Sequence, residues 1–256
     1  MLKLATEKIS TNRINDFIQK YFKKEELDKN LTKNNLDNTV KAYLALDDYA
    51  KENGINSYTI KCVPEPIYLL GANPCGINSI LTENDYISGC EGDVMTTLTM
   101  EILSIFSGKR PLTVDIMSIR ETDDSVLLWH CGAGAPSIAG KNKITYCNSP
   151  ILVKDGIKQG VCADFIPEYD EVSMGALVED WKLNNYKFFI ANGKAVETKP
   201  FIGGNPIKIK FNIKGEDLGT YLTDNHLSQH YQVVGKNISK LIEEFCFWKE
   251  IELLKL

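Results

Sequence analysis

Two carboxylates stand at positions that an ordinary fold does not require. Glu91 lies in the stretch Gly89-Cys-Glu-Gly-Asp93, directly ahead of a predicted helix, and Asp115 lies inside the apolar segment 112–117. An aspartate in an apolar strand is costly to bury unless it is paired, hydrogen-bonded or bound to a metal. Because ligands commonly meet an α/β sheet at the ends of its strands, we interpret Asp115 as functional. For Glu91 the pattern alone favours a simpler explanation, since a carboxylate ahead of a helix stabilises the helix dipole.

The chain has three histidines, His130, His226 and His230. His130 follows an apolar, strand-like segment, and the other two stand just before another apolar run. Carboxylates and imidazoles together form an oxygen and nitrogen ligand set that suits Mn²⁺, Mg²⁺ or Fe²⁺. A lone histidine beside a strand is more often structural than a ligand, and the sequence alone does not show that these groups converge. The role of His226 is left open.

The first part of the chain is expected to form an α/β region that positions the carboxylates. The expected elements are a helix from Asp37 or Asn38 to about Glu52, a strand over 58–62, a helix over 94–106 and a strand over 111–116. Gly54 ends the first helix, because glycine adopts the left-handed conformation past a helix C-terminus. The order of helix, turn and strand therefore occurs twice.

After about residue 125 the pattern changes to short strand-like segments separated by Gly, Pro and Asn. These segments are 126–129, 143–146, 159–165, 171–178, 186–190 and 207–213. This spacing favours an antiparallel sandwich or barrel, and helical spacing of apolar residues over 237–254 predicts a closing helix. We therefore predict a polar helical segment over 1–35, an α/β domain over 36–124 that carries the carboxylates, and a β-rich domain over 125–256 that carries the histidines.

The composition limits the classes of protein to which the chain can belong. Its 29 Lys and Arg against 34 Asp and Glu give a net charge of −5, which argues against binding to nucleic acid or anionic membranes. No run of 18 uncharged apolar residues exists, and the first eight residues carry charges where a signal peptide would be apolar. The seven cysteines form no Cys-x-x-Cys pair and are interpreted as small buried hydrophobes in a reducing compartment. These features predict a cytoplasmic protein.

Five segments, in this order, resemble the L-fucose isomerase and L-arabinose isomerase superfamily. They are Cys90-Glu-Gly-Asp-Val94, Gly108-Lys-Arg-Pro111, Val114-Asp-Ile116, Val126-Leu-Leu-Trp-His-Cys-Gly132 with Ala135-Pro136, and Gln229-His-Tyr-Gln-Val-Val-Gly235. The spacing of 24 residues between Glu91 and Asp115 is also similar to the fucose isomerase pattern. The resemblance covers the chain from about residue 36 onward and is strongest over 89–136.

The resemblance implies an aldose–ketose isomerase that acts through an enediol intermediate. It also implies a divalent metal, typically Mn²⁺, with Mg²⁺, Fe²⁺ or Co²⁺ as alternatives. Matched residue by residue, Glu91 and Asp115 would bind the metal and shuttle the proton, and His230 would be the metal-binding histidine. His130 matches a histidine that binds metal in the arabinose branch, and with Trp129 it would contact the sugar.

The same resemblance implies a small-molecule sugar as substrate and a homo-oligomer, either a trimer or a hexamer. In the family a substantial N-terminal region precedes the part that matches Leu36, and here about 35 polar residues stand in that place. Two alternatives therefore stay open: a non-catalytic sugar-binding or regulatory homologue, and a half-enzyme that needs a separate N-terminal subunit. The sequence does not identify the sugar.

Overall fold

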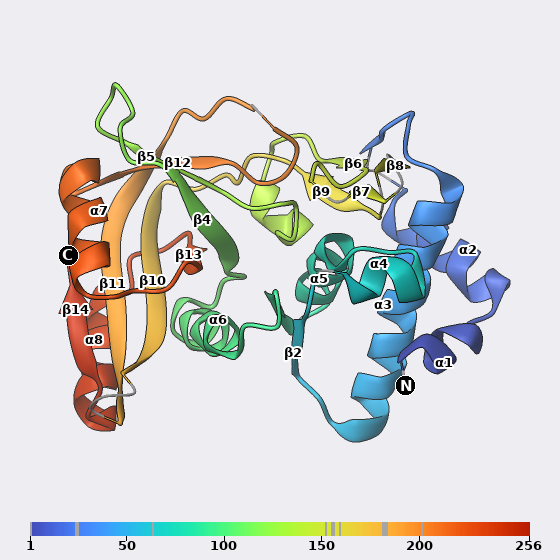
Figure 1. Cartoon of the computed structure of the whole chain (residues 1–256), viewed down its shortest axis with the longest axis horizontal. Coiled ribbons are helices and arrows are strands. Elements are labelled where there is room, and N and C mark those ends of the chain that lie inside the picture. Colours follow the sequence, from blue (N-terminus) through green and yellow to red (C-terminus); the bar gives the residue numbers. More distant parts are fainter. Residues whose placement is uncertain are drawn as a thin grey trace. The chain divides into compact units, whose positions relative to one another are not determined.

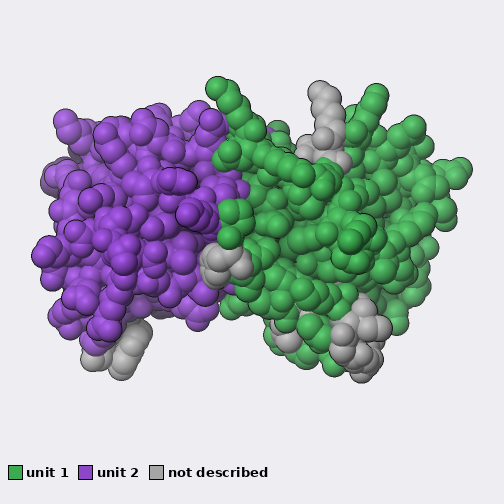
Figure 2. Space-filling model, turned by 90° about the horizontal axis from the view of Figure 1, so that it is seen from above, with its two compact units in different colours: residues 1–93, 131–165, 200–205 green, residues 94–130, 166–199, 206–256 purple. Residues whose placement is uncertain are grey.

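Contacts between residues divide the chain into two units, which Figure 2 shows in different colours. Unit 1 comprises residues 1–93, 131–165 and 200–205, and unit 2 comprises residues 94–130, 166–199 and 206–256. The structure is a computed structural model that describes residues 2–23, 26–62, 64–151, 153–154, 157–158, 160–180, 184–200 and 202–256. Residues 24–25 of the predicted N-terminal segment and the first residue of the strand predicted over 159–165 lie outside the described residues.

Unit 1 is built mainly of helices around small sheets. Its helices are α1 (Leu2–Glu7), α2 (Thr11–Tyr21), α3 (Lys33–Asn53), α4 (Glu65–Leu70), α5 (Pro74–Glu83) and the 3₁₀ helix η1 (Pro136–Ala139). Its strands are β1 (Glu26–Leu27) with β6 (Thr145–Cys147) and β9 (Cys162–Asp164), β2 (Ser57–Ile60) with β3 (Ile87–Cys90), and β7 (Val153–Lys154) with β8 (Ile157–Lys158). Strands β2 and β3 run parallel, and the chain between them forms α4 and α5; of these four elements the sequence had predicted only β2.

Helix α3 shows how local sequence sets the ends of an element. Its N-cap is Thr32, whose hydroxyl accepts a hydrogen bond from the backbone N–H of Asn35 at 3.2 Å. The predicted cap at Asp37 or Asn38 was therefore wrong by about one and a half turns. The predicted end is confirmed, because Gly54 follows the helix in the left-handed conformation, with a φ of 66°.

Unit 2 contains a closed antiparallel β-barrel (Figure 1). The barrel strands are β4 (Leu112–Ser118), β5 (Val126–Trp129), β10 (Glu171–Asp180), β11 (Asn185–Val196), β12 (Ile207–Phe211) and β13 (Tyr231–Val234). They pair in the order β10, β13, β4, β5, β12, β11, and the β10–β11 hairpin closes the ring. A further strand, β14 (Glu252–Lys255), adds to β11 in parallel. The sequence pattern favoured an antiparallel sandwich or barrel, and the structure has a barrel. Of the predicted segments, 143–146 and 159–165 do not join it but supply β6 and β9 of the separate β1–β6–β9 sheet.

The interior of the barrel is apolar because side chains alternate between the two faces of each strand. The inward residues include Leu112, Val114, Leu128, Met174, Phe189, Ile207, Ile209 and Val233, each at most 1% exposed. Burying one such side chain stabilises the fold by about 1.5–3 kcal/mol. Alternation along β4 has a second consequence: it turns Thr113 and Asp115 to the outer face of the barrel.

Two helices cover part of that outer face. Helix α6 (Val94–Ser107) packs on β10 and β13, and α8 (Ser239–Lys249) lies beside β11 and β14 (Figure 1). The helices and the strands together form a buried cluster of Leu103, Leu177, Phe188, Ile190, Val234, Ile238, Ile242 and Cys246. The third helix of the unit, α7 (Gly215–Asp224), buries Leu218 and Leu222. Among the described residues, no helix is both long and apolar enough to cross a membrane.

The division into units differs from the predicted domain boundaries. The range 36–124 contains part of both units, because β4 does not join β2 and β3 but pairs with β5 and β13 of the barrel. The predicted β-rich range 125–256 likewise includes residues 131–165 and 200–205 of unit 1. The predicted closing helix is shorter than expected, since α8 ends at Lys249 and the chain continues as β14.

Candidate metal centre

Asp115 and His230 are brought together by the pairing of β4 with β13. In that antiparallel pair Tyr231 stands opposite Val114, and continuing the register by one residue places His230 opposite Asp115. Residues that face each other across antiparallel strands have side chains on the same face of the sheet. A bulge in β4 follows directly, between Ile116 and Ser118, and bulges often occur beside functional sites.

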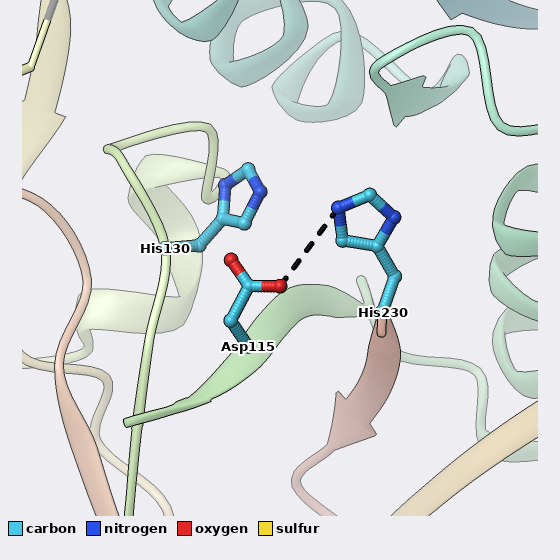
Figure 3. A group of neighbouring side chains, drawn as sticks. All are labelled: Asp115, His130 and His230. Carbon is cyan, nitrogen blue, oxygen red and sulfur yellow. Dashed lines mark ion pairs between the residues drawn. The ribbon is translucent and has the colours of Figure 1, made fainter. Parts of the chain in front are cut away.

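His130 reaches the same place from β5. Trp129, the last residue of that strand, stands opposite Asp115, and His130 is the next residue of the chain. The side chains of Asp115, His130 and His230 point toward one another (Figure 3), and one ligand atom from each lies within 4.8 Å of the others. All three residues belong to unit 2, although they are far apart in the sequence.

The burial of this cluster fits a bound cation. His130 is 1% exposed and His230 is 5% exposed, whereas the Asp115 side chain keeps an exposure of 25%. The rings of the two histidines lie edge to face, with their centres 6.0 Å apart. Two nearly buried imidazoles and one partly open carboxylate leave a side from which a ligand can approach.

The distance between Asp115 and His230 suits shared coordination better than a direct bond. Nε2 of His230 lies 3.9 Å from Oδ1 of Asp115, which is too long for a hydrogen bond (Figure 3). Two ligands that each bind one ion at about 2.1 Å can be at most about 4.2 Å apart, so 3.9 Å is within range. Oδ1 of Asp115 is a buried atom with no hydrogen-bond partner among the described residues. A buried oxygen of this kind needs an explanation, and a cation supplies one.

The donor atoms limit the choice of ion. One carboxylate oxygen and two imidazole nitrogens suit divalent ions of intermediate softness, such as Mn²⁺, Fe²⁺, Co²⁺ or Zn²⁺. The same set of two histidines and one carboxylate occurs in non-haem Fe(II) oxygenases. The ligands therefore point to a divalent metal without identifying the reaction.

The three-residue cluster does not include the other predicted site residues, all of which the structure describes. Glu91 belongs to unit 1, where it follows β3 in an exposed turn, so its membership of the metal site stays a prediction. Its φ of 58° is unusual for a residue other than glycine, and such strained backbone is often found at functional sites. His226 is exposed in the loop after α7 and does not belong to the cluster. Trp129, expected to contact a sugar, is 6% exposed.

The structure adds two residues that the sequence reasoning did not select. On the face of β4 and β13 that carries Asp115 and His230, the next cross-strand pair is Thr113 with Gln232. The Thr113 hydroxyl donates a hydrogen bond of 2.8 Å to Oε1 of Gln232, and the two residues are only 5% and 0% exposed. The sequence did carry a signal for these two residues, which is strand alternation: Thr113 stands two residues before Asp115, and Gln232 stands two residues after His230.

A groove of about 910 Å³ opens beside Asp115 on unit 2. Its lining includes apolar side chains such as Ile116 and Leu227 and the hydroxyls of Thr220, Thr223 and Ser228. The volume and the mixture of apolar and polar groups suit a small polar molecule. Asp115 thus belongs both to the cluster with the histidines and to the lining of a groove that a ligand can enter.

Barrel and cluster together define a protein with a candidate divalent-metal site on the outer face of a β-barrel. No known family profile matches the chain. Among curated proteins it is similar to sulfoquinovose isomerase from Alkalicoccus urumqiensis, with 27% identity over 219 residues, which is 84% of this chain and 48% of that protein. It is also similar to sulfoquinovose isomerase from Priestia megaterium (strain ATCC 12872 / QMB1551), with 25% identity over 216 residues, 82% of this chain and 47% of that protein.

A third sulfoquinovose isomerase, from Clostridium sp. (strain MSTE9), is 34% identical over 111 residues, which is 43% of this chain and 25% of that protein. Homologues that carry the name of a sugar isomerase thus cover most of this chain. The chain spans about half the length of the first two of these relatives.

Proposed function

We propose that this chain is the metal-binding part of an aldose–ketose isomerase. The observation that carries the proposal is the Asp115–His130–His230 cluster, found in a chain that aligns over more than four-fifths of its length with proteins named sulfoquinovose isomerase. The substrate that we propose is an aldose of the kind that those relatives' name describes, a sulfonated hexose.

The three clustered residues would hold the metal, for which Mn²⁺ is our first choice. A bound divalent ion would polarise the sugar carbonyl and stabilise the negative charge that develops on the neighbouring oxygens during isomerisation. His130 and His230 hold their nitrogens in place because both side chains are buried, so little side-chain entropy remains to be lost on binding. Asp115 contributes the negative charge of the ligand set.

Isomerisation also needs a base that moves a proton between two neighbouring carbons. A carboxylate can do this when the proton lies within hydrogen-bond reach, and a well-placed acid or base contributes roughly 10²–10⁴-fold to the rate. We assign this role to Glu91 and Asp115, with one carboxylate oxygen taking the proton from C2 of the aldose and returning it to C1, while the proton of the C2 hydroxyl passes to the C1 oxygen. The strained backbone of Glu91 supports its assignment as a functional residue.

Turnover is expected to need more chain than the part that aligns. Because the aligned part spans about half of the relatives, we propose that the remaining sugar contacts come from a further segment, either in the same polypeptide or in a separate subunit. An oligomer in which neighbouring copies complete each pocket is part of the same proposal.

Calorimetric titration of metal-stripped protein with Mn²⁺ tests the metal site. We expect one site per chain in the wild type and a loss of affinity of more than tenfold in His230→Gln and in Asp115→Asn. His226→Gln and Asp217→Asn are the matched controls, since both residues are exposed in the same unit and lie outside the cluster. Equal affinity in His230→Gln and His226→Gln would refute the assignment. Conversion of sulfoquinovose to its ketose, followed by carbon-13 NMR, then tests the reaction.

A further inference from the structure

Six of the seven cysteines lie in unit 1 as close pairs of thiols, and the proposed metal site uses none of them. All seven are free thiols. The pairs are Cys62 with Cys90 at an Sγ–Sγ distance of 3.3 Å, Cys147 with Cys162 at 3.4 Å, and Cys75 with Cys131, which share a hydrogen bond. These pairs differ in backbone geometry and in access, so they are not equally able to react.

The backbone around Cys147 and Cys162 already suits a disulfide. The two residues stand directly opposite each other in the antiparallel pair of β6 and β9. Such partners have Cα atoms about 4.5–5.5 Å apart, which lies within the range of about 4.4–6.8 Å found in disulfides. Cys62 and Cys90 have no such pairing, since the residue opposite Cys90 in β2 and β3 is Ile60.

Access separates the same two pairs. Cys147 is partly exposed, whereas its partner Cys162 is buried, and both Cys62 and Cys90 are buried. A pair with one accessible thiol and one buried thiol has the usual arrangement of an oxidant-sensitive cysteine with its resolving cysteine. A small oxidant can reach the first sulfur, and the second is already in contact with it.

The contact also favours the reactive form of the accessible thiol. The sulfur atoms of Cys147 and Cys162 are hydrogen-bonded at 3.4 Å, and this contact lowers the pKa of Cys147 below its ordinary value. Burial and the negative charges of Asp164 and Asp28 act in the opposite direction, and the positive charge of Lys158 supports the lowering. The pKa of Cys62 is lowered in the same way by its hydrogen bond with Cys90, but Cys62 is buried. Because the nucleophile is an accessible thiolate, we expect Cys147 to be the first sulfur to be oxidised.

We propose that Cys147 and Cys162 form a reversible disulfide when the protein meets a hydroperoxide. The Cys147 thiolate attacks one oxygen of hydrogen peroxide, the O–O bond breaks, and hydroxide leaves, so that Cys147 becomes a sulfenic acid. The Cys162 sulfur then attacks the Cys147 sulfur, the S–O bond breaks, and the hydroxyl group leaves as water with the Cys162 proton. In total two thiols and one hydrogen peroxide give one disulfide and two waters.

The disulfide would close the chain between residues 147 and 162 into a loop and tie β6 to β9. Cross-links of this kind restrict the unfolded chain and so raise the temperature of unfolding. The backbone N–H of Ala163 in β9 donates a hydrogen bond of 3.0 Å to the carbonyl of Gly132. The disulfide would therefore also fix the strand that holds the backbone of Gly132. Oxidation would therefore stiffen unit 1 without adding a ligand.

Graded oxidation of the full chain with hydrogen peroxide, followed by alkylation and peptide mass mapping, tests the proposal. We expect a linked pair of peptides containing Cys147 and Cys162 at peroxide concentrations that leave Cys62 and Cys90 fully alkylated, and dithiothreitol should reverse the link. The proposal is overturned if Cys62 and Cys90 link first, or if Cys147 stays reduced or proceeds to sulfinic acid without a link.

Two variants sharpen the result. In Cys162→Ser the sulfenic acid of Cys147 has no resolving thiol, so a dimedone probe should label Cys147 at least tenfold more than in the wild type. Cys62→Ser is the matched control, and it should leave both the link and the dimedone labelling unchanged. Equal labelling of Cys147 in Cys162→Ser and in the wild type would contradict the role of Cys162.

Discussion

Replacing Thr113 with valine tests how β4 and β13 are held together beneath the candidate metal site. The substitution keeps the shape of the side chain but removes the hydroxyl that donates 2.8 Å to Oε1 of Gln232. Gln232 is 0% exposed, and its Nε2 already lacks a hydrogen-bond partner among the described residues. In Thr113→Val both Oε1 and Nε2 of the buried Gln232 amide would therefore lack a hydrogen-bond partner among the described residues.

The expected loss of stability depends on which polar groups each substitution leaves without a hydrogen-bond partner. A buried polar group that loses its partner costs about 1–3 kcal/mol, so we expect Thr113→Val to lower the free energy of unfolding by that amount. Gln232→Met should cost about 1 kcal/mol, because the Thr113 hydroxyl keeps only its contact with the Met100 sulfur at 3.7 Å. The double variant replaces both partners by apolar groups of similar shape and should be close to the wild type.

Urea unfolding of the four proteins, followed by circular dichroism, measures the coupling. We expect the sum of the two single effects to exceed the double effect by about 2–4 kcal/mol. If the single effects add up to the double effect within about 0.5 kcal/mol, the hydrogen bond does not couple the strands and the reasoning fails. Titration of the same proteins with Mn²⁺ reports whether the site loosens when the pair is broken.

Two further outcomes follow from local geometry. Gly132→Ala should destabilise the protein strongly, because the φ of Gly132 is 89° and the new Cβ would lie 2.5 Å from Cβ of Cys162. Gly54→Ala is the control, since Gly54 has a φ of 66° and open space around it. In urea unfolding Gly54→Ala should cost only about 1 kcal/mol. Arg13 donates two hydrogen bonds of 2.8 Å to Asp48 and holds the pKa of that carboxyl below its ordinary value of 3.8. This pair stabilises the fold above about pH 4, and its contribution is lost as the pH falls through the lowered pKa. Asp48→Asn should therefore lose more stability at pH 7 than at pH 3, and equal losses at both pH values would contradict this assignment.

The sequence predicted individual strands better than it predicted their partners. Alternation and turn residues located β5, β10 and β12, because those signals are local. Strand β4 was expected in the same α/β domain as β2, but a short apolar run does not show which sheet it joins. Its partner β13 lies more than a hundred residues away, and only the closure of the barrel selects that pairing.

Helix α7 was missed for a related reason. Its sequence contains Gly215 and Gly219, which lower helix propensity and suggest a turn. In the structure a Cβ at Gly215 would lie 2.3 Å from the carbonyl oxygen of Ile119, and one at Gly219 would lie 2.7 Å from Cδ1 of the Ile119 side chain. The glycines therefore allow a close approach of the helix to the end of β4, which tertiary packing requires and local sequence does not reveal.

The candidate site shows the same division between local and long-range information. Asp115 was selected because an aspartate inside an apolar strand needs a reason, and that argument uses only neighbouring residues. That His130 and His230 lie beside it depends on two strand pairings, so the residues alone did not predict the cluster. Their grouping with Glu91 came from the resemblance and stays a prediction.

The interleaving of the two units has a consequence for the order in which the protein can fold during synthesis. The chain passes from one unit to the other after residues 93, 130, 165, 199 and 205. Domains usually fold as units while the chain emerges from the ribosome, the N-terminal one first. Here unit 1 is incomplete until residue 205 has been made, and the barrel cannot close until β12 and β13 follow. The exposed edges of β4 and β5 must therefore wait for their partners through the synthesis of about a hundred further residues, which makes this protein a candidate for chaperone assistance.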